Sequence, residues 1–587
     1  MSGDKQELRF HGAGVSPGIA RGPIHVVRDD LDDVPRYPIE PSQIASEIAR
    51  FEAALVQTRV QILEMQQEIA EAIGTKDAAI FDAHLLVVED RTLIDEVLRK
   101  LETDLCNVEW VFQEVATKYA ETLGRIDDPY LRERALDIQD VTRRIVLNLQ
   151  GKAPKPLRGL TEPHILVAHN LTPSDTATMS HQQVLGIATD LGSRTSHTAI
   201  LARSLNIPAI VGLHDATDKL ETGQQVLLDG YDGLLIVDPT PETLSHYGEI
   251  EASKGRVVQR LRGLRETKST TRDGRHIVLS ANIELPSDVE AVLANGAEGI
   301  GLYRTEFLFV NRGTLPSEQE QYETYRKVAE QVLPHPLIIR TFDLGGDKLA
   351  AGTVDIGDEL NPFLGWRAIR FCLENIDIFK TQLRAILRAG AVGNVKIMFP
   401  MISGLEELRQ AMSVLNECKE ELRAAKIDIG KEMEAGAMIE IPSAAIASDM
   451  LAREVDFFSI GTNDLIQYAI AVDRVNERIA HLYAPTHPSV LRLLKFTADA
   501  AHANDIWVGV CGEMAGDVAL SPLLLGLGVD ELSVSATLVP QVKLAVQNLA
   551  TPECRQLVDE ALKLSTASEI LERCLELATA RYGDLLG

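Results

Sequence analysis

Cysteine pairs, long apolar runs and an excess of basic residues are all missing from this 587-residue chain. The six cysteines are scattered and none belongs to a CxxC pair, which argues against a zinc knuckle and against a disulfide framework. No window approaches the roughly eighteen uninterrupted apolar residues of a membrane span. Residues 1–7 lack the apolar core of a signal peptide. We therefore expect a reduced, cytoplasmic chain without membrane insertion.

The shortage of basic residues excludes a general nucleic-acid binder. The chain has 58 Lys and Arg against 86 Asp and Glu, a formal net charge of −28, so it has no basic excess to neutralise nucleic-acid phosphates. Its 45% hydrophobic and 25% charged residues are typical of a globular protein. A chain of this length predicts several domains, each with its own core.

The N-terminal 240 residues combine short strands with one long helical segment. A Gly-rich stretch (12–20) and a strand-like one (22–27) precede the helical segment, and strand-like runs (165–168, 184–190, 209–211, 225–229 and 234–237) follow it. We therefore expect one α/β domain built from residues 1–30 and 151–240. Residues 31–150, where Ile44, Ile48 and Phe51 begin a helical period, form an inserted helical domain.

The inserted helices are strongly acidic. Residues 31–150 carry 13 Lys and Arg and 24 Asp and Glu, and 13 − 24 = −11 is over a third of the excess charge of the whole chain. An acidic helical face suits a basic docking partner. The alternative is a charged face that is simply solvated, and the sequence alone leaves both interpretations open.

Residues 241–270 form a polar, charged helical linker, and the remaining chain alternates strands with helices. Eight strand-like segments can be counted in residues 271–587: 276–283, 299–303, 337–341, 395–399, 436–441, 456–460, 507–511 and 531–535. Eight strand-then-helix units predict a (β/α)8 barrel. The fold class is thus multidomain α/β.

The run Gly192-Ser193-Arg194-Thr195-Ser196-His197-Thr198 presents an imidazole between a buried strand and an apolar helix. Thr195 or Ser196 is a reasonable N-cap for that helix, so His197 would lie at a helix N-terminus. The positive end of the helix dipole attracts anions and favours a neutral, nucleophilic imidazole. Phosphate is the anion that fits best. The alternative is an imidazole that merely caps or packs at this turn.

Polar residues also follow the predicted barrel strands, where barrel enzymes hold their active sites. They are Asn282, Arg304, Arg340, Asp343, Glu440, Asn463, Asp464, Cys511 and Glu513. Together with Arg474, the arginines Arg304 and Arg340 offer guanidinium forks for phosphate and carboxylate oxygens, although each alone could be a salt-bridge partner.

Two further kinds of group complete the predicted barrel chemistry. Glu440 and Asp464 are hard oxygen ligands that suit Mg²⁺. Cys511 ends an apolar strand, where a buried thiol could protonate a carbanion; its alternative role is that of a small core residue. The set predicts a small, phosphorylated substrate that carries a carboxylate and reacts through an enolate.

These two sites together resemble enzyme I of the bacterial phosphoenolpyruvate-dependent sugar phosphotransferase system. The similarity runs over essentially the whole chain, and its most specific blocks are residues 13–20, 192–212, 299–309, 361–367, 457–468 and 510–517. One departure is visible, because Ser193 stands where the family usually has a second glycine. If that position needs a positive φ, the serine has a modest cost.

The resemblance implies a role for each residue. His197 matches the phosphohistidine, and Cys511 matches the proton donor. The phosphoenolpyruvate-binding residues match Arg304, Arg340, Asn463, Asp464 and Arg474, with Arg367 as a further contact, and the Mg²⁺ ligands match Glu440 and Asp464.

The resemblance also implies partners. The inserted helices would dock the histidine phosphocarrier protein HPr, the barrels would form a homodimer, and the α/β domain would swivel between the barrel and HPr to drive sugar uptake.

Two rival functions share features with this sequence. A pyruvate phosphate dikinase or phosphoenolpyruvate synthase shares the histidine loop and the barrel, but it carries a nucleotide-binding domain for which this chain has no room. A signalling, nitrogen-type paralogue usually adds an N-terminal sensory domain. Here the first block that resembles the family, which contains Ser16-Pro17-Gly18, already begins at residue 13. We expect the sugar-system enzyme.

Overall fold

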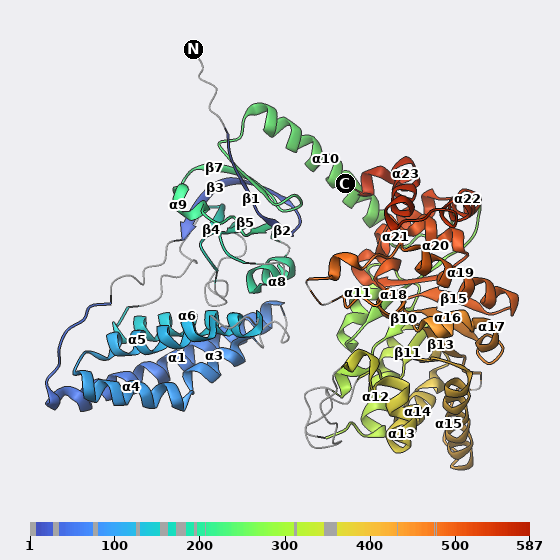
Figure 1. Cartoon of the computed structure of the whole chain (residues 1–587), viewed down its shortest axis with the longest axis horizontal. Coiled ribbons are helices and arrows are strands. Elements are labelled where there is room, and N and C mark those ends of the chain that lie inside the picture. The colour runs from blue at the N-terminus through green and yellow to red at the C-terminus, as the bar shows by residue number, and fades with distance from the viewer. Residues whose placement is uncertain are drawn as a thin grey trace. The chain divides into compact units, whose positions relative to one another are not determined.

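A computed structural model of the chain describes residues 7–27, 34–73, 80–124, 129–152, 162–171, 183–192, 196–205, 207–309, 314–344, 361–430, 432–474, 476 and 478–586. It divides into two compact units, Met1–Glu251 and Ala252–Gly587. Figure 1 shows the first unit as a helical bundle and a sheet, and the second as a ring of strands surrounded by helices.

The helical bundle lies between strands of the sheet along the chain. Its helices are α1 (Ile44–Ile73), α3 (Ile80–Val88), α4 (Arg91–Asp104), α5 (Val108–Gly124) and α6 (Pro129–Leu149). Apolar residues at helical spacing, such as Phe51 on α1, Phe112 on α5 and Ile145 on α6, form one buried core. The helices therefore form a body with its own interior.

Eight strands from both flanks of the bundle form a single sheet. They are β1 (Leu8–His11), β2 (Ala13–Ser16), β3 (Ile19–Val27), β4 (His164–Ala168), β5 (Val184–Thr189), β6 (Ala209–Val211), β7 (Gln225–Asp229) and β8 (Leu234–Val237), in the order β1-β8-β7-β3-β4-β5-β6-β2. Strands β3, β4, β5 and β6 are parallel neighbours. Helices α8 (His197–Ser204) and α9 (Ala216–Lys219) follow β5 and β6.

The sheet curls strongly on itself. Strands β1 and β2 occupy its two edges, yet His11 and Ala13 are separated only by Gly12. A flat sheet of eight strands would separate its edges by roughly 34 Å, whereas three residues span about 7 Å. Gly12, which joins the two edge strands along the chain, donates its N–H to the carbonyl of Gly233 in the turn between β7 and β8. Gly233 has φ +70°, and a Cβ there would lie 2.4 Å from the carbonyl oxygen of Gly12.

Helix α10 (Pro241–Gly263) contains the boundary between the two units. At its start, Glu7 accepts hydrogen bonds from Thr240 N–H (2.7 Å) and Thr243 Oγ1 (2.6 Å), and Tyr247 is buried against the sheet. Near its end, Arg260 pairs with Asp584 of the second unit at 3.5 Å. Each end of α10 is therefore anchored to a different unit.

The second unit is a closed barrel of eight parallel strands. The strands are β9 (Val278–Ile283), β10 (Ile300–Tyr303), β11 (Leu337–Arg340), β12 (Val395–Phe399), β13 (Ala435–Ile439), β14 (Phe457–Ile460), β15 (Trp507–Val510) and β16 (Glu531–Ser535), and β16 pairs with β9. All eight strands predicted from the sequence are present, with bounds that differ by at most two residues.

Thirteen helices connect and surround the barrel strands over the described residues. They are α11 (Val289–Ala294), α12 (Glu318–Val332), α13 (Ala368–Glu374), α14 (Ile376–Ala389), α15 (Leu405–Ala424), α16 (Pro442–Ile446), α17 (Ser448–Leu451), α18 (Thr462–Ile470), α19 (Pro488–Ala503), α20 (Ser521–Leu527), α21 (Val539–Asn548), α22 (Thr551–Ala561) and α23 (Ala567–Leu586).

Alternation along the strands gives the barrel two separate cores. Leu337 and Ile339 of β11 belong to the large core between strands and helices, whereas Ile338 belongs to a small cluster that contains one residue from each of six neighbouring strands or strand ends. The members of this cluster are Leu302, Ile338, Met398, Met438, Phe457 and Cys511. It fills the barrel interior, so the barrel is closed below its carboxyl-end mouth.

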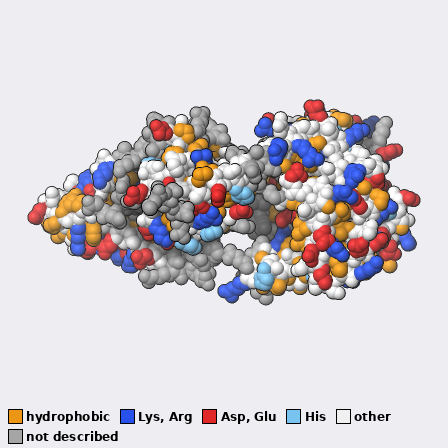
Figure 2. Space-filling view, turned by 90° about the horizontal axis from the view of Figure 1, so that it is seen from above, with side chains coloured by type: hydrophobic (Ala, Val, Ile, Leu, Met, Phe, Trp, Pro, Cys, Tyr) orange, Lys and Arg blue, Asp and Glu red, His pale blue; other side chains and the backbone are white. Residues whose placement is uncertain are grey.

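The surface of the second unit, on the right in Figure 2, carries interspersed acidic and basic side chains on the face that is shown. Acidic side chains are therefore not concentrated in a single patch on that face. Within the described residues, no helix has both the length and the apolar character that crossing a membrane requires.

Candidate active site

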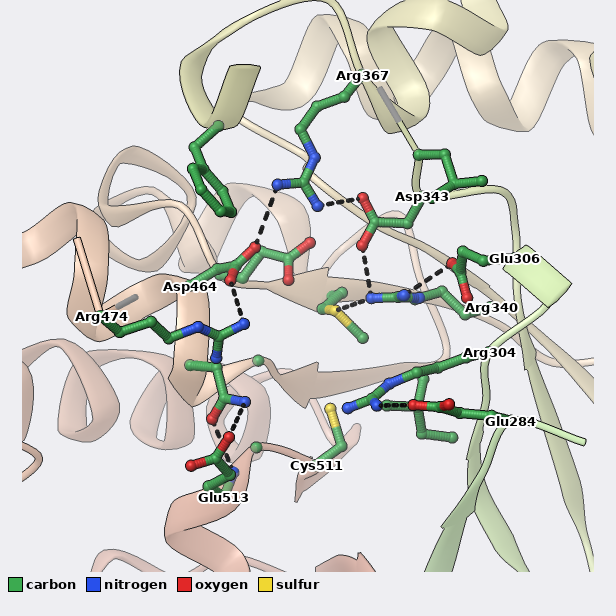
Figure 3. A pocket seen from close by; sticks show the side chains of 18 of the residues that line it. Glu284, Arg304, Glu306, Arg340, Asp343, Arg367, Asp464, Arg474, Cys511 and Glu513 are labelled. Carbon is green, nitrogen blue, oxygen red and sulfur yellow. Dashed lines mark hydrogen bonds and ion pairs between the residues drawn. The ribbon is translucent and has the colours of Figure 1, made fainter. Parts of the chain in front are cut away.

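A cavity of about 790 Å³ opens at the carboxyl ends of the barrel strands. Its charged lining consists of four arginines (Arg304, Arg340, Arg367 and Arg474) and six carboxylates (Glu284, Glu306, Asp343, Glu440, Asp464 and Glu513). Parallel strands all end at the same edge, which is why residues far apart in the sequence meet here. Figure 3 shows these side chains converging from several strand ends.

Carboxylates hold the arginines in fixed orientations (Figure 3). Arg340 donates to Glu306 at 2.8 Å and pairs with Asp343 at 2.7 Å, and Asp343 also accepts from Arg367 at 2.7 Å. Arg304 donates to Glu284 at 2.8 Å. Although burial opposes it, Asp343 and then Glu306 raise the pKa of Arg340 above its ordinary value. The guanidinium groups are therefore charged and preorganised.

Three of these guanidinium groups keep buried N–H donors without a hydrogen-bond partner among the described residues. The donors are Nε of Arg340, Nε of Arg367 and one terminal nitrogen of Arg474. Buried donors are normally satisfied, and an unsatisfied one costs roughly 1–3 kcal/mol. An anionic ligand with several oxygens would satisfy them, so the arrangement favours a phosphate or carboxylate substrate.

Glu440 and Asp464 lie side by side at this mouth as a pair of crowded carboxylates. Burial, with the charges of Asp343 and Asp464, raises the pKa of Glu440 to about 8. Asp464 is 3.8 Å from the nearest nitrogens of Arg367 and Arg474, too far for hydrogen bonds. Glu440 Oε1 accepts a hydrogen bond from Met401 N–H at 2.6 Å, and two carboxylates crowded in this way fit a divalent cation.

The carboxylate pair suits Mg²⁺ in particular. No cluster of three or more metal-ligating side chains exists among the residues that the structure describes. Mg²⁺ is held by one or two carboxylates and completes its coordination with water and substrate oxygens. Glu440 and Asp464 therefore fit Mg²⁺ bound together with a phosphorylated substrate.

Cys511 follows β15 and lines the same cavity, where its sulfur is drawn in Figure 3. Its Sγ donates to the carbonyl of Ile460 at 3.6 Å, and the residue is only 2% exposed. Burial raises the pKa of Cys511 to about 11. A thiol with that pKa stays protonated at neutral pH, so Cys511 has the properties of a proton donor.

Comparison with known proteins agrees with this chemistry. Residues 258–551 match the family described as PEP-utilising enzyme, PEP-binding domain, while residues 11–134 match its N-terminal domain and residues 160–233 its mobile domain. The chain is 45% identical to a phosphoenolpyruvate-protein phosphotransferase of Bacillus sp. (strain S) over 96% of this chain and 97% of that protein. It is 43% identical to the protein of that name from Bacillus subtilis (strain 168), over 96% and 98%. The chain belongs to the phosphoenolpyruvate-protein phosphotransferase family, a family of enzymes.

The barrel of this phosphotransferase family member brings together nearly all of the residues that the sequence predicts for it. The predicted residues that line the cavity are Arg304, Arg340, Asp343, Arg367, Glu440, Asn463, Asp464, Arg474, Cys511 and Glu513. Asn463 and Glu513 bond each other twice: Glu513 N–H donates to Asn463 Oδ1 at 2.8 Å, and Asn463 Nδ2 donates to Glu513 Oε1 at 3.2 Å.

Asn282 differs from the prediction. It lies at the end of β9 but is not part of the cavity lining. Its Nδ2 donates to the carbonyl of Cys511 at 3.0 Å, and its Oδ1 accepts from Ser533 at 2.6 Å. The amide therefore joins β9 to β16 and to the residue that follows β15.

Sequence reasoning missed Glu284 and Glu306, the carboxylate partners of Arg304 and Arg340. Glu306 lies two residues after Arg304, in a 3₁₀ turn that follows β10, and Glu284 directly follows β9. Their positions just beyond strand ends could have identified both residues from the sequence. Each of these acids holds one arginine of the cavity: Glu306 pairs with the buried Arg340, and Glu284 pairs with the half-buried Arg304.

The predicted phosphohistidine belongs to the first unit. His197 is the first residue of α8, and the N-cap is Ser196 rather than Thr195, although its side chain makes no capping bond. Residues 193–195, and the side chain of His197, lie outside the described residues. The prediction about Ser193 therefore stays a prediction. Gly192, directly before it, has φ +120°.

Proposed function

We propose that this chain takes the phosphoryl group of phosphoenolpyruvate onto His197, releases pyruvate, and passes the group to a histidine of HPr to drive sugar uptake. The observation that carries the proposal is the set of unsatisfied, buried guanidinium donors of Arg340, Arg367 and Arg474 at the barrel mouth. Membership of the phosphoenolpyruvate-protein phosphotransferase family supports the same substrate.

The barrel residues bind and orient the substrate in this proposal. Arg304, Arg340 and Arg474 take the phosphate and carboxylate oxygens, with Arg367 as a further contact and Asn463 on the phosphate. Glu440 and Asp464 hold Mg²⁺, which stabilises negative charge on the transferring oxygens when it is bound. Because the arginines are already fixed by Asp343 and Glu306, little reorganisation accompanies the reaction.

The first half-reaction transfers one phosphoryl group and then protonates the enolate that this transfer leaves. A ring nitrogen of His197 attacks phosphorus in line, while the bond between phosphorus and the enol oxygen breaks and leaves pyruvate enolate. The Cys511 thiol gives its proton to the methylene carbon of that enolate, which becomes pyruvate. The phosphorylated His197 ring releases its N–H proton to solvent, and solvent returns a proton to the Cys511 thiolate.

His197 must travel between two partners. It belongs to the first unit, the cavity belongs to the second, and the boundary between them lies within α10. We therefore propose that the α/β domain swivels, with residues 241–268 as the hinge.

An exposed apolar pair on the bundle supports docking of HPr there. Leu63 on α1 and Leu86 on α3 are 36% and 68% exposed. Two contacts set these helices antiparallel and place the leucines between them: Arg59 to Glu89 and Gln66 to Asp82, each at 2.8 Å. Apolar side chains within an acidic surface suit a partner with an apolar patch and a basic rim.

A second exposed apolar group supports a homodimer through the barrel. Ile446 (α16), Met450 (α17) and Phe496 (α19) are each more than half exposed. Ser448 Oγ donates to the carbonyl of Phe496 at 3.4 Å, so α17 and α19 are adjacent at this point. Clustered apolar side chains of this kind mark interaction surfaces.

Pyruvate release tests the proposed function. With phosphoenolpyruvate, Mg²⁺ and catalytic amounts of enzyme, we expect sustained pyruvate formation only when HPr is added as acceptor, and none with His197→Ala. Sustained formation that requires a nucleotide, or that survives in His197→Ala, would overturn the proposal and favour a dikinase-type reaction.

A further inference from the structure

A second imidazole lies at the carboxyl ends of the parallel sheet strands, where α8 also begins. His169 directly follows β4, and its side chain is 57% exposed. Its Nδ1 is 3.4 Å from Oδ2 of Asp190, which directly follows β5. A carboxylate only accepts hydrogen bonds, so Nδ1 is the donor and Nε2 is left to face outward.

Asp190 is held rigidly, so it can orient His169. It is only 1% exposed and accepts hydrogen bonds from the N–H groups of Ala216 (2.6 Å) and Thr217 (3.2 Å) at the start of α9. The Thr217 hydroxyl donates to the same carboxylate. A carboxylate that is buried and accepts this many hydrogen bonds is held in one position, so it also fixes the orientation of the imidazole bonded to it.

His169 is a close neighbour of the predicted phosphohistidine along the backbone. Strands β4 and β5 are parallel and paired up to Ala168 and Thr189, so the residues that directly follow them lie together at the same end of the sheet. The carbonyl of Leu171 accepts from Thr198 Oγ1 at 3.1 Å, and the carbonyl of His169 accepts from Leu191 N–H at 2.9 Å. The segment after β4 is therefore bonded to both sides of the His197 turn.

We propose that His169 binds the phosphoryl group while His197 carries it, an inference that rests on the proposed function. With Asp190 on Nδ1 and a phosphoryl oxygen on Nε2, the ring donates from both nitrogens as an imidazolium. No covalent bond to His169 forms. Its charge stabilises the phosphoryl oxygens during transfer to and from His197, as guanidinium groups do in the barrel.

Transfer kinetics test the inference with the full-length enzyme. In rapid-quench experiments with phosphoenolpyruvate and Mg²⁺, we expect His169→Ala to slow phosphorylation of His197 about tenfold, the size of one charge-assisted hydrogen bond. His169→Gln, which keeps an N–H donor, recovers part of the rate. KM for phosphoenolpyruvate stays unchanged because the substrate binds in the barrel. His11→Gln, a change at an exposed histidine on β1, is the matched control and behaves as wild type.

A spectroscopic readout on the wild type removes any dependence on folding of the variants. Adding phosphoenolpyruvate shifts the ¹⁵N signal of His169 Nε2 in the wild type and leaves it unchanged in His197→Ala. A wild-type rate in His169→Ala, or an unmoved His169 signal in phosphorylated enzyme, overturns this inference alone. Failure of the wild type to acquire phosphate on His197 overturns the proposed function instead.

Discussion

At the scale of single residues, burial sets the orientation and the pKa of ordinary side chains at the barrel mouth. Asp343 shows this most directly, because its two oxygens each hold a different arginine. The same low exposure raises the pKa of Cys511 and keeps its proton in place. The reacting groups are thus set in position and in protonation state before any substrate arrives.

The thiol of Cys511 gives a prediction at this scale. Cys511→Ala removes the proposed proton donor for the enolate, so we expect pyruvate formation to fall by roughly 10²- to 10⁴-fold, the usual contribution of a positioned acid. Cys418 on α15, whose pKa burial also raises to about 11, is the matched control, and Cys418→Ala retains the wild-type rate. The measurement is the initial rate of pyruvate release. An unchanged rate in Cys511→Ala would assign the proton to another group.

At the scale of elements, the sequence predicts the barrel well and the first sheet incompletely. Barrel strands are apolar runs such as 435–439, buried on both faces, and their ends carry the polar residues, so one pattern marks strand and site together. Strands β1 and β2 escaped prediction because each has four residues and the exposed side chains of β1 break the apolar pattern. Asn282 was placed in the site wrongly, since strand position alone does not say which way an end residue turns.

The anchor of α10 gives a prediction at the element scale. Hydrogen bonds from Thr243, Thr240 and Arg9 lower the pKa of Glu7 from 4.5 to about 2. A lowered pKa in the folded state contributes stability that is fully present above pH 4.5 and lost as the pH falls toward 2. Glu7→Gln therefore destabilises the start of α10 by about 1 kcal/mol at pH 7, and this difference disappears as the pH falls through 2.

Amide hydrogen exchange of Thr240 measures this effect. We expect faster exchange in Glu7→Gln at pH 7, and convergence with the wild type in acid. Glu221→Gln, an exposed change in the same unit, is the control and leaves the Thr240 exchange rate unaltered. Equal protection of Thr240 in Glu7→Gln and wild type at pH 7 would show that Glu7 does not anchor the helix.

At the scale of the whole molecule, the proposed phosphohistidine, His197, and the proposed substrate cavity belong to separate compact units. This division explains why the sequence around His197 left its role open, because the groups proposed to bind the phosphoryl donor lie more than a hundred residues further along the chain. It also means that swivelling of the α/β domain is a requirement of the proposed reaction.

The apolar surface of α16, α17 and α19 gives a prediction about assembly. In a two-fold symmetric interface each substitution counts twice. Phe496→Ser should therefore weaken the dimer by roughly tenfold or more, as seen by sedimentation across a concentration series. Leu293→Ser on α11 removes a similarly exposed side chain elsewhere on the barrel and should leave the dimer intact. A wild-type protein that sediments as a monomer, or a Phe496→Ser dimer of unchanged strength, would contradict this assignment.

The central claim is that His197 carries the phosphoryl group, and direct mapping of that group tests it best. The enzyme is incubated with phosphoenolpyruvate labelled in its phosphoryl group and with Mg²⁺, without ATP, and acid-labile phosphate is located by peptide mapping. The account predicts one labelled residue, His197, and no label in His197→Ala. Absence of label from His197, or label that persists in His197→Ala, would contradict it.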